Sequence, residues 1–161
     1  MPDGPPQKGP DYDDDFYAWT QHQAAVLREM PVADNRFDRE HVAEEIEDLG
    51  NSVRNAVRSQ ARRIIEHFLK LQYSPAKEPR NGWVESIFDA RQEISDNMTP
   101  TLRREIGSEL ARLYRDGRKR AAMGLVHHDE AEQAQLLPDA CPYTFDQILE
   151  DDWYPEPVEQ P

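Results

Sequence analysis

Four side chains of metal-binding types recur at helical spacing in the first half of the chain. His41, either Glu44 or Glu45, and Asp48 lie three or four residues apart, so a helix would place them on one face. Imidazole and carboxylate groups at that spacing could hold a divalent metal. A di-iron bundle needs Glu-x-x-His on two helices, and this sequence offers the related pair Asp38 and His41 once. We therefore favour a solvated acidic face near a helix N-terminus, with a metal site or a salt-bridged cluster facing Arg91 or Arg118 as alternatives.

His67 is a second candidate for chemistry, because an imidazole can act as a ligand or as a general base. It lies between Ile64 and Phe68 at the edge of an apolar stripe, which predicts partial burial. A structural histidine bonded to a backbone carbonyl or a carboxylate is the commoner arrangement. Arg62 and His67 also resemble the arginine and histidine pattern of HEPN-class ribonucleases, small and usually dimeric bundles that cut RNA without metal. Five residues apart, these side chains lie roughly 140° apart around a helix, so the pair stays an alternative.

Charge is unevenly distributed along the chain, whose net charge is −13. Asp129–Pro161 has ten acidic residues and no lysine or arginine, and Met1–Asn35 carries −5, which leaves the middle at +2. Basic residues follow one helical face in two segments: Arg54, Arg58 and Arg62, and Arg112, Arg115 and Lys119. Such stripes can bind phosphates, but more often they pair with neighbouring acids. Because the acidic C-terminal segment could fold over them, we do not expect the intact chain to bind nucleic acid.

Apolar spacings of three and four residues predict the helices that position these groups. The first helix is capped by Asp13 or Asp14, runs to about Met30, and has an apolar stripe made of Phe16, Trp19, Val26, Leu27 and Met30. The second runs from Asp38 to about Tyr73, with Gly50-Asn51 as its weak point. We expect one long second helix, bent or briefly interrupted there.

Three further helices follow in the sequence. Gly82 lies in a linker, and the third helix carries apolar residues from Trp83 to Met98. Thr99-Pro100 starts a fourth helix that fades near Gly124, since a hydroxyl caps free amides and proline suits the first turn. Thr144 caps a short last helix. The pattern predicts an all-α fold: a four-helix bundle with a long second helix and a short C-terminal helix docked on it.

One helical domain over 11–154 is expected from a chain of 161 residues. The Pro-rich ends, 1–10 and 155–161, are expected to be disordered tails. No uncharged run approaches the length of a membrane span, and the first residues lack the pattern of a secretory signal. A single cysteine excludes an internal disulfide. These observations predict a cytoplasmic protein.

Large aromatic side chains are predicted to be structural. They are spread over the helices or near their ends: Trp19, Trp83, Tyr114 and Trp153. We expect Trp153 and Phe145 to anchor the C-terminal helix on the bundle. Cys141 has no basic neighbour in sequence that would lower its pKa, so it is expected to be a packed residue rather than a nucleophile.

Several segments, in this order, resemble the bacterial family known as domain of unknown function twenty-nine. They include YDDDFYAW at 12–19, HVAEEIEDLG at 41–50, HFLK at 67–70 and CPYT at 141–144. The resemblance spans about 11–155. Phe68 stands where the family usually has leucine, and 126–135 fits less well. The resemblance implies an all-helical fold and a bacterial origin, and it carries over no catalytic residue.

The function we expect is that of a non-catalytic helical protein that acts through a protein partner, with a homodimer as an open alternative. Acidic segments would bind a basic or helical surface of that partner. No cofactor is predicted. The alternative function is a metal-binding or HEPN-like ribonuclease bundle that uses the His41–Asp48 face or Arg62 and His67.

Overall fold

The fold was described from a computed structural model, in which residues 7–159 are described and every regular element among them is an α-helix. This confirms the all-α prediction. The helices are α1 (Phe16–Glu29), α2 (Arg39–Tyr73), α3 (Arg80–Asn97), α4 (Pro100–Ser108), α5 (Leu110–His127), α6 (Ala131–Leu136) and α7 (Phe145–Leu149). Within the described part, none of them is both long and apolar enough to cross a membrane. Most of the expected N-terminal tail and the end of the C-terminal one, 1–6 and 160–161, lie outside the described residues.

The chain divides into two compact units, which are described separately. Unit 1 holds the residues up to Asn55 together with Thr99–Arg104, and unit 2 holds Ala56–Met98 and the residues from Glu105 onward. Helices α2 and α4 therefore contribute residues to both units.

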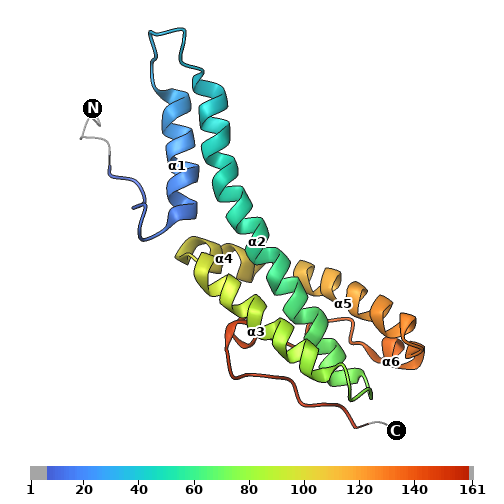
Figure 1. Ribbon diagram of the computed structural model, residues 1–161. Helices are drawn as coiled ribbons and strands as arrows, with labels where there is room; N and C mark the ends of the chain where they lie inside the picture. The colour runs from blue at the N-terminus through green and yellow to red at the C-terminus, as the bar shows by residue number, and fades with distance from the viewer. Residues whose placement is uncertain (1–6, 160–161) are drawn as a thin grey trace. The chain divides into compact units, whose positions relative to one another are not determined.

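In unit 1, α1 and the first part of α2 lie side by side as a helical hairpin (Figure 1). The cap of α1 is Asp15, whose Oδ1 accepts the Ala18 amide at 2.9 Å, so the prediction of Asp13 or Asp14 was wrong. Its second oxygen accepts the Thr101 amide at 2.8 Å, in the first turn of α4. Burial alone would raise the pKa of Asp15, but these amide hydrogen bonds lower it below its ordinary value. One carboxylate thus caps two helix starts.

Small side chains let α1 and α2 approach closely. Thr20 and Ala24 of α1 and Ala43 of α2 are buried, and so is Gly50. A Cβ atom added to Gly50 would lie 2.0 Å from Thr20 Oγ1. Gly50, the expected weak point, is therefore the place where the helices touch, and α2 is unbroken from Arg39 to Tyr73.

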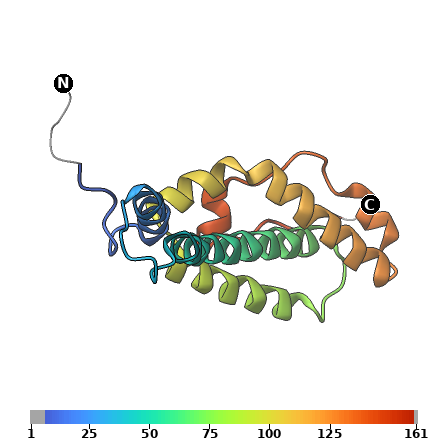
Figure 2. The same ribbon diagram turned by 90° about the horizontal axis from the view of Figure 1, so that it is seen from above.

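In unit 2, the second part of α2 lies between α3 and α5 (Figure 2). Its side chains are buried on more than one side, which this position explains: Val57, Ala61, Ile64, Ile65, Phe68 and Leu69. Helices α3 and α5 add Ile87, Ile94, Leu113, Tyr114 and Leu125 to this core, and Ile106 of α4 and Ile148 of α7 are buried as well. Gly117 allows α5 to approach α2, since a Cβ there would lie 2.8 Å from Ile65 Cγ2.

Two helix boundaries differ from the prediction. The single fourth helix expected from Thr99 to about Gly124 is two helices, because Glu109 adopts a turn conformation between α4 and α5. The Glu109 carboxylate accepts hydrogen bonds from the Arg58 guanidinium, and this contact holds the turn against α2. Gly82 lies inside α3 rather than in a linker, and α6 was not predicted.

The two threonine caps are confirmed. Thr99 Oγ1 accepts the Leu102 amide at 3.2 Å, and α4 begins at Pro100. Thr144 and Gln147 form a reciprocal capping box at the start of α7, with Oγ1 of Thr144 accepting the Gln147 amide at 3.1 Å.

The C-terminal segment is held on unit 2 through its backbone. Arg91, 2 % exposed on α3, donates to four carbonyls at 2.8–3.1 Å, those of Gln147, Ile148, Asp151 and Trp153. Farther along, the Val158 amide donates to the Gln72 carbonyl at 2.9 Å and Pro155 is buried, in the segment where the sequence predicts a disordered tail. Backbone carbonyls rather than acidic side chains thus dock this segment on Arg91.

Candidate functional site

The predicted acidic face lies on the exposed first turns of α2. The His41 Nδ1 atom lies 2.6 Å from Asp38 Oδ2, and this hydrogen bond raises the pKa of His41 above its ordinary value. Glu44, Glu45 and Asp48 are exposed on the same part of the helix. Within residues 7–159 no three histidine, cysteine or acidic side chains gather in a way that could hold a metal ion.

Two neighbouring acids of α2 bind across the hairpin instead. Arg28 of α1 donates to Glu40 at 3.1 Å and to Glu47 at 2.8 Å. Gln21 donates to the Glu47 carbonyl at 3.2 Å. These contacts fix the register of α1 on α2 and leave Glu44 and Glu45 to solvent.

Most of the apolar stripe predicted for the first helix lies outside the α1–α2 seam. We call this exposed part the α1 stripe; it comprises Phe16, Trp19, Val26 and Met30 of the prediction, together with Tyr12, which the prediction did not include. Tyr12, Val26 and Met30 are 54 %, 37 % and 49 % exposed. The seam itself is made of the buried residues Tyr17, Thr20 and Ala24, which lie on a neighbouring face of α1. Because the hairpin packs through small side chains, the large apolar ones are left half-exposed.

Aromatic rings consolidate one end of this stripe. The Tyr12 ring packs edge-on against Trp19 and Phe16, with centroid distances of 4.9 and 5.3 Å. Trp19, predicted to be structural, therefore belongs to a surface cluster that is half-buried rather than to a core.

The Arg62 and His67 pair is not assembled into one pocket. Arg62 lines a small polar pocket with Arg63 and Arg120, and its Nη1 lies 3.8 Å from Asp116. His67 does not line that pocket, and its Nδ1 is buried without a hydrogen-bond partner. Burial lowers the pKa of His67 to about 4, so the ring is neutral at pH 7.

The basic stripes are partly compensated within each unit. In unit 1, Arg54 donates to the Tyr17 hydroxyl at 3.0 Å. In unit 2, Arg58 pairs with Glu109, and Arg118 donates to Asp139 and to the Leu137 and Pro138 carbonyls. Arg91 and Arg118 therefore bind backbone carbonyls of the C-terminal part. Neither arginine forms an ion pair with the acids of the His41–Asp48 face, which was the alternative drawn from the sequence.

The other predicted structural residues lie in unit 2. Tyr114 is buried and donates to the Pro138 carbonyl, and burial raises its pKa to about 12. Trp153 packs against Phe68 at a centroid distance of 5.2 Å. Cys141 is half-buried, and burial raises the pKa of its thiol, as expected of a packed residue.

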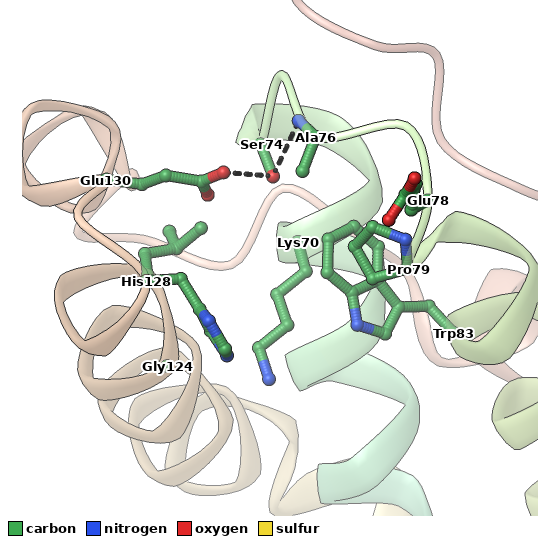
Figure 3. Close-up of a pocket in the computed structure, with 10 residues that line it drawn as sticks. Lys70, Ser74, Ala76, Glu78, Pro79, Trp83, Gly124, His128 and Glu130 are labelled. Carbon is green, nitrogen blue, oxygen red and sulfur yellow. Dashed lines mark hydrogen bonds between the residues drawn. The ribbon is translucent and has the colours of Figure 1, made fainter.

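Trp83 lines a cavity that the sequence did not reveal. The cavity has a volume of about 590 Å³ and lies between α2, α3 and α5 (Figure 3). The Lys70 side chain extends into it, and Glu130 accepts a hydrogen bond from Ser74 at 2.9 Å on its rim. Its lining comes from two separate segments of the chain, 70–83 and 124–130, so no local motif could have predicted it.

Known proteins support the fold and the family. The chain is similar to an α-helical protein of unknown function from Rhodospirillum rubrum, with 27 % identity, a TM-score of 0.80, and coverage of 91 % of this chain and 93 % of that one. A comparison with curated proteins gives no match. The family model described as domain of unknown function DUF29 matches residues 12–154. The chain therefore belongs to the DUF29 family.

Proposed function

We propose that this protein is a non-catalytic binding protein, and that the α1 stripe receives a basic amphipathic helix of a protein partner. The observation that carries the proposal is the exposure of Val26 on α1 and of Tyr12 and Met30 just before and just after it. An apolar helical stripe of this kind suits helix-in-groove recognition, in which anchors recur at three and four residues.

Charge supports a basic partner. Unit 1 has thirteen acidic and seven basic residues, a net charge of −6. Exposed acids lie in both segments of the hairpin, among them Asp13, Asp14 and Glu29 on or before α1 and Glu44 and Glu45 on α2. A second copy of the same surface would bring like charges together, which disfavours a homodimer through this face.

A non-catalytic role agrees with the state of the reactive groups. A base with a pKa of about 4 is a weak proton acceptor at neutral pH, and the Nδ1 atom of His67 is buried without a hydrogen-bond partner. The Cys141 thiol, whose pKa burial raises, is a poor nucleophile.

We also propose a cellular location for the protein and a four-helix bundle as its fold. A bacterial, cytoplasmic location is supported by the solved relative from Rhodospirillum rubrum and by one free cysteine in 161 residues. The four-helix-bundle description is supported in unit 2 by the packing of α3 and α5 against α2.

Binding of a labelled synthetic helix tests the function. The probe is a peptide with leucines on one face and lysines on the other, measured by fluorescence anisotropy. We expect saturable binding that Val26→Asp weakens at least about tenfold, because burying a charge opposes binding. Ala25→Asp adds the same charge at an exposed position off the stripe and serves as the control.

Three results would contradict the proposal. One is the absence of saturable binding, and another is equal loss in the two variants. The third is a dimer by light scattering that Val26→Asp dissociates, since the occupant would then be a second copy.

A further inference from the structure

We infer that the groove between α2 and α5 of unit 2 binds a nucleotide, with its phosphate at an arginine cluster and its base against Trp83. The α2–α5 groove comprises the cavity beside Trp83 and the small pocket lined by Arg62, Arg63 and Arg120. This site lies within unit 2 and does not depend on the partner proposed for α1.

The arginine pocket has the size and chemistry of an anion site. Its volume is about 50 Å³, and Ser59, Arg62, Arg63 and Arg120 line it with hydrogen-bond donors. Arg62 is only loosely paired with Asp116, at 3.8 Å, and within 7–159 neither Arg63 nor Arg120 has an ion pair. In a chain with 32 acidic and 19 basic residues, these cations are left uncompensated. Guanidinium groups bind phosphate oxygens in a bidentate manner.

The one acid in this pocket is already engaged. Glu66 lines it, but its Oε1 lies 2.6 Å from Lys70 Nζ, and both side chains are largely buried. The pair is close to neutral as a whole, so the positive potential of the arginines persists. Lys70 in turn lines the larger cavity, so this ion pair joins the two pockets.

The larger cavity suits a planar ring. Its volume of about 590 Å³ falls in the range of about 300–1,000 Å³ found for small-molecule sites. Trp83, Pro79 and Leu125 supply apolar walls, and Figure 3 shows the indole of Trp83 facing the space that Lys70 enters. An indole stacks on any nucleobase, because every base has a π face.

Charges at the ring end fix the orientation of the ligand. Glu78 and Glu130 line this end, so it repels a phosphate and accepts hydrogen bonds from amino groups. Glu130 accepts one from Ser74 and has further lone pairs available. A ligand with a phosphate at one end and an amino-bearing ring at the other matches both ends.

Helical spacing places both pockets in one groove. Arg63, Glu66 and Lys70 follow one face of α2, with Ser74 directly after its last residue. Arg120 and Gly124 follow one face of α5, with His128 directly after its last residue. Arg63 and Lys70 are about 10 Å apart along the helix, a span that suits a nucleoside monophosphate. Gly124 keeps the groove open beside Lys70, since a Cβ there would lie 2.8 Å from Lys70 Cε.

Calorimetric titration of the full chain tests the site. Adenosine monophosphate should bind saturably, whereas adenosine and inorganic phosphate should each bind at least about tenfold more weakly. Inosine monophosphate, which has an oxygen in place of the amino group, should also bind more weakly. The double variant Arg63→Gln, Arg120→Gln should weaken binding of adenosine monophosphate at least about tenfold.

Two further variants separate a built site from general electrostatics. Arg115→Gln, Lys119→Gln removes two exposed charges from α5 outside the arginine pocket and should change the affinity by less than about twofold. Gly124→Leu should abolish binding without removing a charge, and circular dichroism checks that the variant folds.

The inference is overturned by any of four results. The first is that adenosine, guanosine and cytidine monophosphate all fail to bind saturably at millimolar concentration. The second is that the two double variants lose the same amount of affinity. The third and fourth are that inorganic phosphate or inosine monophosphate binds as tightly as adenosine monophosphate.

Discussion

Asp15 and Arg91 each satisfy backbone groups of a segment distant in sequence. Asp15 accepts the Thr101 amide, 86 residues away, and Arg91 donates to carbonyls 56–62 residues away. Neither contact follows from local pattern, because a charged residue in a helical sequence reads as solvent-exposed. The sequence predicted that a C-terminal helix would dock but could not identify the guanidinium that holds it.

Replacing Arg91 should release the C-terminal segment. Arg91→Met keeps much of the side-chain length but leaves four carbonyls without their donor. We therefore expect the free energy of unfolding to fall by about 3 kcal/mol or more. Amide hydrogen exchange should increase selectively at 144–158. Arg115→Met, at an exposed site of α5, is the control and should leave exchange unchanged. Unchanged protection of 144–158 in Arg91→Met would refute this role.

His67 should make stability depend on pH. Its pKa is about 4 in the folded protein and ordinarily 6.5, so between these values the unfolded chain binds a proton that the folded chain does not. The contribution is fully present above pH 6.5 and is lost as the pH falls toward 4, by up to about 3 kcal/mol.

Urea denaturation at several pH values between 4 and 7 measures this slope. His67→Gln should have a flatter profile than the wild type over the same range. Parallel profiles would mean that the folded protein protonates His67 at its ordinary pKa. The carboxyl of Asp15, whose pKa is lowered, contributes below pH 4 and does not enter this window.

At the scale of the helix, the two threonine caps were predictable, whereas the cap of α1 was placed one or two residues too early. Thr99, Pro100 and Thr144 were identified because their roles depend on neighbours three residues away. The break at Glu109 was missed although Gly107-Ser108 precedes it, because the apolar spacing continues through it. Its cause is tertiary: Glu109 binds Arg58, and a Cβ at Gly107 would lie 3.2 Å from the Phe145 ring.

Two helical glycines should respond in opposite ways to alanine. In an open helical position, Gly→Ala stabilises by up to about 1 kcal/mol. Gly82 meets this condition, since a Cβ there has no neighbour within 4 Å. Gly50→Ala should instead destabilise, because the new methyl would lie 2.0 Å from the buried Thr20.

Chemical denaturation of the two variants provides the comparison. The expected result is a higher midpoint for Gly82→Ala and a lower one for Gly50→Ala. A higher midpoint for both would mean that α1 and α2 do not pack through Gly50.

The α1 stripe shows what helical periodicity can and cannot give. The spacing predicted an apolar stripe from Phe16 to Met30, but an apolar stripe does not say which neighbour covers it. The seam with α2 formed through Thr20, Ala24 and Gly50 because small residues allow close approach. The stripe is thereby available for a partner, and this is the basis of the proposed function.

At the scale of the whole molecule, net charge concealed the local arrangement. The chain carries −13, yet uncompensated arginines line a pocket of unit 2 while unit 1 presents acids beside an apolar stripe. The sequence offered the His41–Asp48 face and Arg62 as candidates. It could not foresee the cavity beside Trp83, because three helices build it. Cavities depend on tertiary packing, which local spacing does not encode.

Site-specific photo-crosslinking in cells that naturally express the protein tests the proposed function most directly. A benzophenone amino acid replaces Val26 on the α1 stripe or, as the control, Ala25 beside it. We predict that position 26 crosslinks to a lysine- and arginine-rich amphipathic helix of another protein, and that position 25 does so far less. Equal crosslinking from both positions, or crosslinking of position 26 to a second copy of this chain, would contradict the proposal.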